Sequence, residues 1–235
     1  MRLDKFLADA GIGTRSEVKA KLKKGLVTVN GLPVSRPETQ INPDTDTVCF
    51  NNDAINYSKY EYYILHKPAG YVTATKDNIF PTVMELIKGS TAKNLAPVGR
   101  LDKDTEGLLL ITNDGELAHN LLSPKKHVDK TYFAIINTAV NESDVEAFEH
   151  GVDIGDDRLT LPARLEIISS AAENSEINLT IHEGRFHQVK RMFHARGKDV
   201  IYLKRISMGA LSLGELPKGE FRSLTEEEIQ LLKKA

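Results

Sequence analysis

The chain has 235 residues, of which 40% are hydrophobic and 27% charged, a composition typical of a globular protein with a sizeable core. Its formal net charge of -2 argues against a protein that coats nucleic acid indiscriminately. The one cysteine, Cys49, cannot form an internal disulfide, and the sequence shows neither a signal-peptide pattern nor an apolar run of about 20 residues. We therefore expect a cytoplasmic protein that does not cross a membrane.

The basic residues gather in two blocks. Residues 1–30 hold seven Lys or Arg against three Asp or Glu, and residues 184–205 hold seven against one. Residues 141–157 hold seven carboxylates and no Lys or Arg. Each basic block could present a local positive face to a polyanion, although solvated helix faces would give the same pattern.

The first fifty residues predict a small unit of two helices and a hairpin. Apolar residues at helical spacing predict a first helix, namely Leu3, Phe6, Leu7 and Ala10. A second helix is expected to begin at Thr14, with Glu17 completing a capping box, and to end at Gly25. The dipeptide Asn30-Gly31 predicts a tight hairpin turn, and a strand should return near residues 47–50.

The rest of the chain predicts many strands and few helices. Polar residues 51–60 lack a sustained period and indicate a linker. Strands are expected near residues 62–67, 95–99, 107–112, 130–136, 163–168, 176–181, 200–206 and 210–213. Helices are expected near residues 82–88, from Leu117 to a break at Pro124, from Asn141 with Val145 and Phe148 turned inward, and after a cap at Thr225 with Glu228. This pattern favours an α+β fold in which the larger domain has a mainly antiparallel mixed sheet.

One further helix is predicted over residues 184–194. Its apolar side would carry Phe186, Val189, Met192 and Phe193. Its polar side would carry His187, Lys190, Arg191 and His194. The resulting domain boundaries are residues 1–48, a linker over 49–60 and a larger domain over 61–235.

Several kinds of chemistry find no support in the sequence. No Gly-rich loop matches a phosphate-binding or dinucleotide-binding pattern, so we expect no nucleotide cofactor and no other cofactor. The seven histidines form neither an H-E-x-x-H motif nor a Cys/His cluster, so we expect no metal. A Ser or Cys nucleophile is poorly supported because no G-x-S-x-G elbow exists. A carboxylate remains the best candidate for a reactive group.

The segment from Val98 to Gly115 supplies such a carboxylate. A short loop with Arg100 and Asp102 leads directly into the apolar strand expected at 107–112. A carboxylate held beside a rigid strand suits a site that must place a nucleophile or base accurately. The spacing alone would equally fit an aspartate that satisfies loop amides and a solvated arginine.

The first 48 residues resemble the small RNA-binding module first recognised in a small-subunit ribosomal protein, here called the S-four-type domain. The matching stretches are M-R-L-D-K-F-L-A, T-R-S-E-V-K and G-L-V-T-V-N-G. In that family the second helix and the following loop contact structured RNA. The resemblance therefore implies RNA contacts from Arg2, Arg15, Ser16, Lys19 and Lys23.

Three later motifs, in order, resemble those of the bacterial pseudouridine synthases related to the enzyme of small-subunit ribosomal RNA. They are G-R-L-D-K-D-T-E-G-L-L-L-I-T-N-D-G, then K-T-Y, then E-G-R-F-H-Q-V-K-R-M. An S-four-type domain ahead of the catalytic domain is also the arrangement of that group. The H-Q-V-K-R-M form and the M-R-L-D-K-F start are more like the small-subunit enzyme than its large-subunit relatives.

The resemblance implies a role for individual residues. Asp102 would be the nucleophilic aspartate, Tyr132 the active-site tyrosine that stacks on the target base, and Lys190 the basic partner that keeps Asp102 ionised. Arg100 would help hold the target nucleotide out of its helix, and Arg185 and Arg191 would bind substrate RNA. The carboxylate could attack the sugar or the base, or assist formation of a glycal intermediate. Asp104 and Glu106 are expected to be dispensable for the chemistry.

The sequence thus predicts a monomeric isomerase that converts one uridine of 16S ribosomal RNA to pseudouridine, on free RNA or an assembling small subunit. Two alternatives stay open. The same chemistry could act on 23S ribosomal RNA, or the fold could have been kept by a non-catalytic RNA-binding factor of ribosome assembly.

Overall fold

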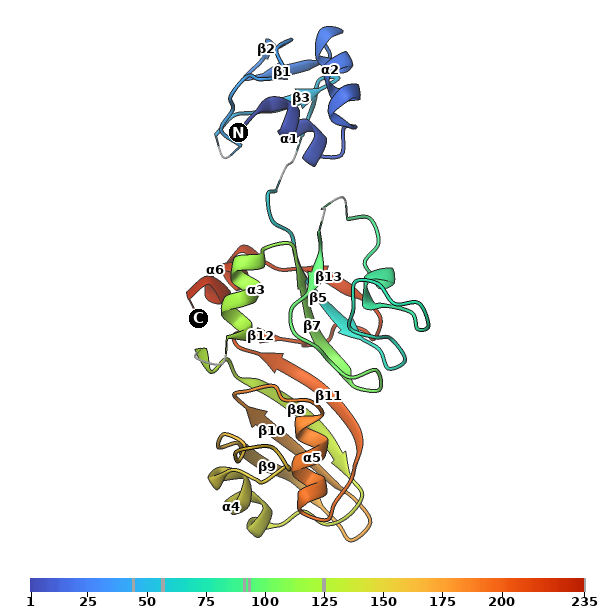
Figure 1. Ribbon diagram of the computed structural model, residues 1–235, viewed down its shortest axis with the longest axis vertical. Coiled ribbons are helices and arrows are strands. Elements are labelled where there is room, and N and C mark those ends of the chain that lie inside the picture. Colours follow the sequence, from blue (N-terminus) through green and yellow to red (C-terminus); the bar gives the residue numbers. More distant parts are fainter. Residues whose placement is uncertain (44, 56–57, 91, 93, 124–125, 235) are drawn as a thin grey trace. The chain divides into compact units, whose positions relative to one another are not determined.

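The computed structural model describes residues 1–43, 45–55, 58–90, 92, 94–123 and 126–234 (Figure 1). The chain divides into two units. Met1–Glu61 with Gly89–Asn94 forms the first, and Tyr62–Lys88 with Leu95–Ala235 forms the second. Within the described ranges, no helix has the length and apolar character needed to cross a membrane.

Two helices and a four-stranded sheet form the first unit. The elements are α1 (Leu3–Asp9), α2 (Arg15–Lys23), β1 (Val27–Val29), β2 (Leu32–Pro33), β3 (Val48–Phe50) and β4 (Asp53–Ala54). The capping box is confirmed, because the Glu17 amide donates to Thr14 Oγ1 at 3.3 Å and the Thr14 amide donates to Glu17 Oε2 at 2.7 Å. The hairpin turn is confirmed as well, with positive φ at Asn30 (51°) and Gly31 (80°).

The first sheet continues beyond the boundary expected at residue 48. Its strand order is β2-β1-β3-β4, in which β3 is the strand expected near residues 47–50 and β4 lies where a linker was expected. The turn between them is Asn51-Asn52, and both residues adopt positive φ (51° and 70°). Asparagine tolerates this conformation because its short polar side chain bonds locally. A tight turn made of two polar residues therefore has the composition of a linker.

The second unit is built on a mixed sheet. Its strands are β5 (Tyr62–Lys67), β6 (Ala96–Pro97), β7 (Glu106–Thr112), β8 (Lys130–Ile136), β9 (Arg164–Ser170), β10 (Ser175–Ile181), β11 (Val200–Met208), β12 (Leu211–Ser212) and β13 (Phe221–Ser223). Its helices are α3 (Gly115–Leu122), α4 (Glu142–His150), α5 (Gln188–Ala195), α6 (Glu226–Lys234) and the 3-10 helix η1 (Val83–Leu86). The main strand order is β13-β5-β7-β11-β8-β10-β9. The pairings between these described strands are antiparallel except for β11 with β7.

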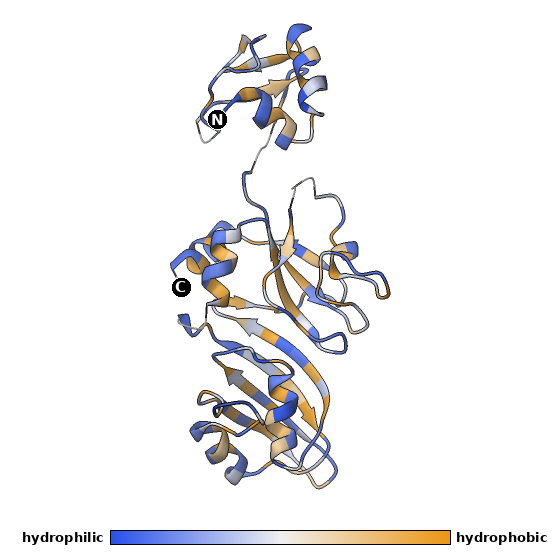
Figure 2. Ribbon diagram, viewed as in Figure 1, coloured by the Kyte–Doolittle hydropathy of each residue, from blue (hydrophilic) through white to orange (hydrophobic). Residues whose placement is uncertain are grey.

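Most expected elements of this unit are present, and the α+β fold is confirmed. Hydrophobic residues run through the middle of β7 and along one side of α5 (Figure 2). Phe148 of α4 is fully buried and packs edge-on against Phe193, with ring centroids 5.0 Å apart. Strand β13, which pairs with β5, has no counterpart in the predictions. The break expected at Pro124 lies outside the described residues.

The helix expected over residues 184–194 begins later than its periodicity indicates. His187 has φ of +49° and precedes α5, so Phe186 lies outside the helix and is 74% exposed. The prediction that Phe186 belongs to the apolar side was wrong. A residue in the left-handed region interrupts the helical period that links Phe186 to Val189.

Strands β7 and β11 approach each other very closely at Gly107. They pair in parallel through Glu106 with Lys204 and through Gly107 with Arg205. Gly107 has φ of +108°, and a Cβ placed on it would lie 2.2 Å from the carbonyl oxygen of Arg205 and 2.6 Å from its amide nitrogen. Only glycine fits here, and this contact joins the two halves of the large sheet.

Lys67, at the end of β5, fastens the loop that contains Asp102. The side chain is completely buried, and its Nζ donates to the carbonyl oxygens of Thr105 at 2.7 Å, Pro68 at 3.1 Å and Lys103 at 3.2 Å. Burial lowers the pKa of Lys67 to about 8, while the charges of nearby carboxylates oppose the change. The loop before β7 is therefore held by a buried amine.

The substitution Gly107→Ala should lower the free energy of unfolding by at least about 3 kcal/mol, because backbone atoms would have to move to admit the methyl group. The control is Gly115→Ala at the start of α3, where an added Cβ meets nothing within 4 Å. This control should change stability by less than about 0.5 kcal/mol. Equal effects of the two changes in urea denaturation would contradict the close approach.

The pKa of Lys67 makes stability depend on pH. Between pH 8 and about 10 the unfolded chain binds a proton at Lys67 that the folded chain has released, so stability rises with pH. Across this pH range, the free energy of unfolding of the wild type should rise by about 3 kcal/mol relative to that of Lys67→Met. Urea denaturation at a series of pH values measures the difference, and Lys88→Met, at an exposed lysine, should follow the wild-type curve. A constant difference between wild type and Lys67→Met would contradict a lowered pKa.

Candidate active site

Asp102 lies on the wall of a cavity of about 1050 Å³ in the second unit. Its loop is fixed on both sides. Thr73 Oγ1 donates to the carbonyl of Leu101 at 2.7 Å and accepts from the amide of the same residue at 3.2 Å. The carbonyl of Asp102 accepts from the Thr105 amide at 3.1 Å. The Asp102 side chain is 29% exposed, so its carboxylate is open to the cavity while its backbone is held.

Two nitrogen-bearing side chains from the helix segment face this carboxylate. Nζ of Lys190 is 3.7 Å from Oδ2 of Asp102, and Nε2 of His187 is 3.5 Å from Oδ1. Lys190 makes shorter contacts with Asp104, donating to its two carboxylate oxygens at 2.6 and 2.7 Å. Burial opposes the change, but the hydrogen bond and charge of Lys190 lower the pKa of Asp104 overall. Lys190 is therefore near Asp102, as expected, but hydrogen-bonds to Asp104.

Tyr132 and Arg205 form a second part of the cavity wall. They face each other as an antiparallel pair on β8 and β11, so their side chains leave the same face of the sheet. Both side chains are buried, Tyr132 at 8% and Arg205 at 2% exposure. The structure thus places the predicted tyrosine in the same cavity as Asp102, next to an arginine that the sequence analysis did not single out.

Arg185 and Arg191, expected to bind RNA, are engaged with the protein itself. Arg185 donates to Glu183 at 3.0 Å and to the carbonyl oxygens of Arg158 at 2.8 Å and Leu159 at 2.6 Å. Arg191 donates to a carboxylate oxygen of Asp156 and to the carbonyl of Ile154, both at 2.5 Å. These bonds hold the loop over residues 154–159 against the start of α5. Arg185 also lines the cavity, whereas Arg191 does not.

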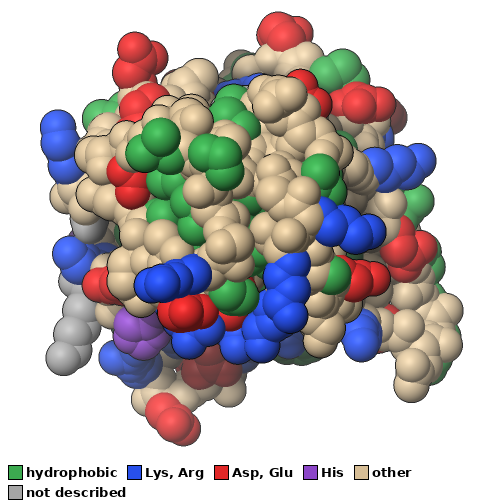
Figure 3. Space-filling model, turned by 90° about the horizontal axis from the view of Figure 1, so that it is seen from above, with side chains coloured by type: hydrophobic (Ala, Val, Ile, Leu, Met, Phe, Trp, Pro, Cys, Tyr) green, Lys and Arg blue, Asp and Glu red, His purple; other side chains and the backbone are tan. Residues whose placement is uncertain are grey.

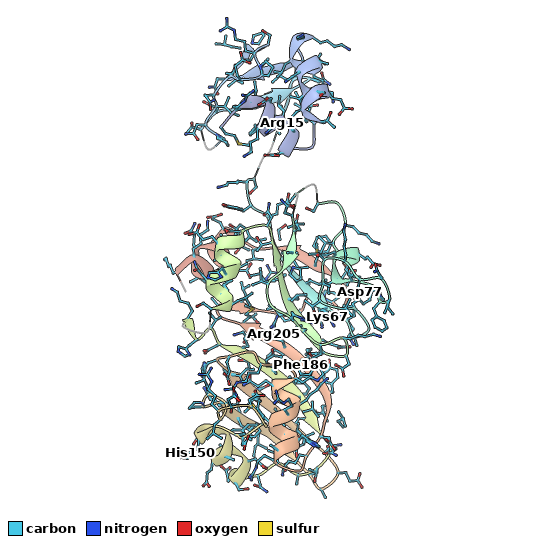
Figure 4. All side chains as sticks on the ribbon, viewed as in Figure 1. Arg15, Lys67, Asp77, His150, Phe186 and Arg205 are labelled. Atoms are coloured by element: carbon cyan, nitrogen blue, oxygen red, sulfur yellow. The ribbon has the colours of Figure 1, made fainter. Side chains whose placement is uncertain are left out.

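The mouth of the cavity carries exposed side chains. Arg100 is exposed and lines the cavity, as its expected role in holding a nucleotide requires. The Phe186 ring, whose position is labelled in Figure 4, is exposed. It stacks on His187, with centroids 3.8 Å apart and planes 17° apart. An exposed flat ring at the mouth of a cavity is suited to stacking against a nucleobase.

All five residues expected to contact RNA in the first unit are exposed, namely Arg2, Arg15, Ser16, Lys19 and Lys23. Arg2 is bonded to the buried carboxylate of Asp4 at 3.0 and 2.9 Å. The remaining side chains project from α2. Among the residues that the structure describes, no three His, Cys, Asp or Glu side chains gather as metal ligands would.

Comparison with known proteins agrees with this geometry. Residues 61–195 match the family model of RNA pseudouridylate synthases, and residues 1–46 match that of the S4 domain. An uncharacterized RNA pseudouridine synthase of Bacillus subtilis is 47% identical over 99% of this chain and 98% of its own length. The ribosomal small subunit pseudouridine synthase A of Escherichia coli K12 is 39% identical over 97% of this chain and 98% of its own.

A solved structure supports the same assignment. The crystal structure of a pseudouridylate synthase is 38% identical, covers 99% of both chains and superimposes with a TM-score of 0.69. The matches span both units, so the order of an RNA-binding module and a catalytic domain is shared. The chain belongs to the RNA pseudouridylate synthase family, and it is an RNA pseudouridine synthase, an isomerase, with an S4 domain ahead of its catalytic domain.

Proposed function

We propose that this enzyme isomerises one uridine of small-subunit ribosomal RNA, with Asp102 as the nucleophile. The observation that carries the proposal is the partly exposed carboxylate of Asp102 on a cavity wall, beside Lys190 and His187 and in the same cavity as Tyr132. The choice of RNA rests on the relatives. Ribosomal small subunit pseudouridine synthases A from several bacteria are 39–42% identical over nearly the whole chain.

The residues that line the cavity would each contribute to a different step of this reaction. Uracil must leave its helix to enter the cavity, which costs a few kcal/mol of unstacking. Tyr132 offers a ring on which the base can stack, and stacking returns about 1–3 kcal/mol. Exposed Arg100 at the mouth can bind the phosphate of the displaced nucleotide. Lys190 places a positive charge 3.7 Å from the Asp102 carboxylate that would attack.

The reaction needs no second substrate. Uridine and pseudouridine contain the same atoms, so the bond from ribose to N1 is exchanged for a bond to C5 without net oxidation or reduction. A carboxylate that binds the sugar or base, or assists formation of a glycal, is sufficient for this exchange. We accordingly propose that the enzyme works without a cofactor.

The exposed basic residues of α2 would anchor the enzyme on folded RNA. Basic and acidic side chains are interspersed on the face seen in Figure 3, in keeping with a net charge of -2. Binding would then depend on local phosphate contacts from residues such as Arg15 and Lys19. Such contacts position a protein without reading a base. Because ribosomal RNA is the proposed substrate, we also propose that the enzyme acts in the cytoplasm.

Asp102→Asn should abolish release of tritium from RNA labelled at C5 of uridine, with a loss of at least about 1,000-fold, because the amide cannot act as a nucleophile. Asp104→Asn is the matched control. Asp104 is 72% exposed and pairs with Lys190 at the surface, so the rate should change by less than about fivefold. Glu106→Gln should likewise remain active, since Glu106 bonds to Tyr202 and Lys218.

The outcomes separate the candidate functions. Equal activity of wild type and Asp102→Asn would show that Asp102 is not the nucleophile. Absence of release by wild type from both ribosomal RNAs would rule out ribosomal RNA as the substrate. Release from 23S but not 16S ribosomal RNA would move the substrate to the large subunit.

Replacing Arg15 and Lys19 together by Gln should weaken binding to small-subunit ribosomal RNA and make it less dependent on salt. Loss of two phosphate contacts should reduce the slope of log K against log salt concentration by about 1.5. The control changes Lys233 and Lys234, exposed in α6, to Gln and removes the same charge. Filter binding at several salt concentrations measures both slopes, and identical slopes for the two variants would rule out anchoring by α2.

A further inference from the structure

Arg205 is a buried cation whose hydrogen bonds are incomplete. Its Nε donates to the carbonyl of Leu108 at 2.8 Å, yet Nη2 is buried and has no acceptor among the described residues. No described carboxylate lies within 4 Å of the guanidinium as an ion-pair partner. A buried guanidinium with an open donor is costly in the empty protein, so an acceptor supplied by a ligand would be strongly favoured.

A second buried cation lies on the same wall. Lys130 is 9% exposed, and its Nζ donates to the carbonyl of Val128 at 2.8 Å. Burial lowers the pKa of Lys130 and the positive charge of Arg205 lowers it further, while the charge of Asp129 opposes the change. Both side chains line the cavity next to Tyr132. This part of the wall therefore presents donors and positive charge, while the carbonyls that bind the two cations leave that charge uncancelled.

We propose that Arg205, assisted by Lys130, binds the carbonyl oxygens of the target uracil and stabilises the negative charge that the ring carries when it is detached. This inference rests on the proposed isomerisation of uridine. A base stacked on Tyr132 would have an edge toward Arg205, because the two residues are direct cross-strand neighbours, whose Cβ atoms lie about 5 Å apart. Arg205 lies on β11, in the central part of the catalytic domain (Figure 4).

The chemistry requires such a group. When the bond between C1′ and N1 breaks, its electron pair stays with the base, and the charge of the resulting anion spreads over O2 and O4. The ring then turns, C5 bonds to C1′, the proton on C5 is lost, and N1 takes up a proton, so no atom or electron is gained overall. Buried donors aimed at oxygens that become negative stabilise such a step strongly.

The symmetry of uracil explains why one arginine can serve both halves of the reaction. A half-turn about the axis through N3 and C6 exchanges N1 with C5 and also exchanges O2 with O4. A side chain that only donates hydrogen bonds thus meets a carbonyl oxygen before and after the turn. Cytosine would present an amino group in one of these orientations, where donor would face donor. Arg205 would therefore also exclude cytidine.

Exchange of oxygen for sulfur in the substrate tests the contact directly, because sulfur is the weaker acceptor. Single-turnover isomerisation is measured on small-subunit RNA transcribed with uridine or with 4-thiouridine. Wild type should be about tenfold slower on the sulfur-containing RNA. Arg205→Met should be about 100-fold slower on uridine and should distinguish oxygen from sulfur by less than about twofold. Full discrimination by Arg205→Met, or an unchanged rate on uridine, would overturn the proposal.

Two further variants guard against a purely structural effect. Arg205→Lys retains a cation and should show an intermediate rate and reduced discrimination, so it decides the question if Arg205→Met does not fold. Lys204→Met, at the neighbouring position outside the cavity lining, should behave as wild type. A loss of rate in Arg205→Lys with full discrimination between oxygen and sulfur would mean that Arg205 supports only the fold.

Binding without reaction separates this inference from the proposed function. Calorimetry with uridine and cytidine 5′-monophosphates should show a preference of about tenfold for uridine in wild type and none in Arg205→Met. The same preference in both proteins would overturn the role of Arg205. A different outcome is that wild type fails to isomerise the RNA but still prefers uridine, and that Arg205→Met loses this preference. That outcome would contradict the proposed substrate or nucleophile and would leave the role of Arg205 intact.

Discussion

The close approach of β11 to β7 at Gly107 is the contact on which the active site depends. On one side of it, β5 and β7 carry the Asp102 loop and its buried clamp, Lys67. On the other side, β8 carries Tyr132. The two sides meet where β7 and β11 pair in parallel through Glu106 with Lys204 and Gly107 with Arg205. The packing there sets how far the carboxylate lies from the wall where a base can stack. A side chain at position 107 would push these surfaces apart, which explains a glycine inside a buried strand.

Backbone carbonyls, more than carboxylates, hold the buried cations around the cavity. Lys67, Lys130 and Arg205 each donate to one or more carbonyl oxygens. A carbonyl satisfies a hydrogen bond, but its dipole does not cancel a unit charge as a carboxylate does. Lys130 and Arg205 consequently keep much of their positive charge on the part of the cavity wall next to Tyr132. The carboxylate of Asp102, the proposed nucleophile, lines the same cavity as Lys130 and Arg205.

Local signals in the sequence predicted much of the fold. The capping box of Thr14 and Glu17, the Asn30-Gly31 turn and the apolar run of β7 depend on residues close together in the chain, and all are present. The cavity was predicted less completely, because its contacts join distant segments. Lys190 lies closer to Asp104 than to Asp102 because of how α5 is placed against the loop before β7. The residue spacing within each of these two segments does not determine that placement.

Three residues were missed or misplaced by reasoning from local sequence patterns, namely Arg205, Lys67 and Phe186. Alternation along β11 puts Arg205 on the same face as buried Leu203, and an arginine at a core-facing position is the one local signal that could have identified it. Lys67 gave no signal, because the carbonyls that it binds lie in its own turn and in a loop almost forty residues further on. The position of Phe186 depended on the backbone conformation of His187, which the helical period hides.

The pairing of β7 with β11 also determines at which stage of folding the active site is completed. Arg205 and the carbonyl that it binds at Leu108 are 97 positions apart, and β8, β9 and β10 lie between the two strands in the sequence. Closing so long a stretch of chain is an entropically expensive step, and contacts of this kind form late in folding. During synthesis, β5, β7 and β8 emerge well before β11. The cavity beside the Asp102 carboxylate is therefore incomplete until β11 has been made. A nascent chain can carry a folded RNA-binding module while its catalytic site has yet to form.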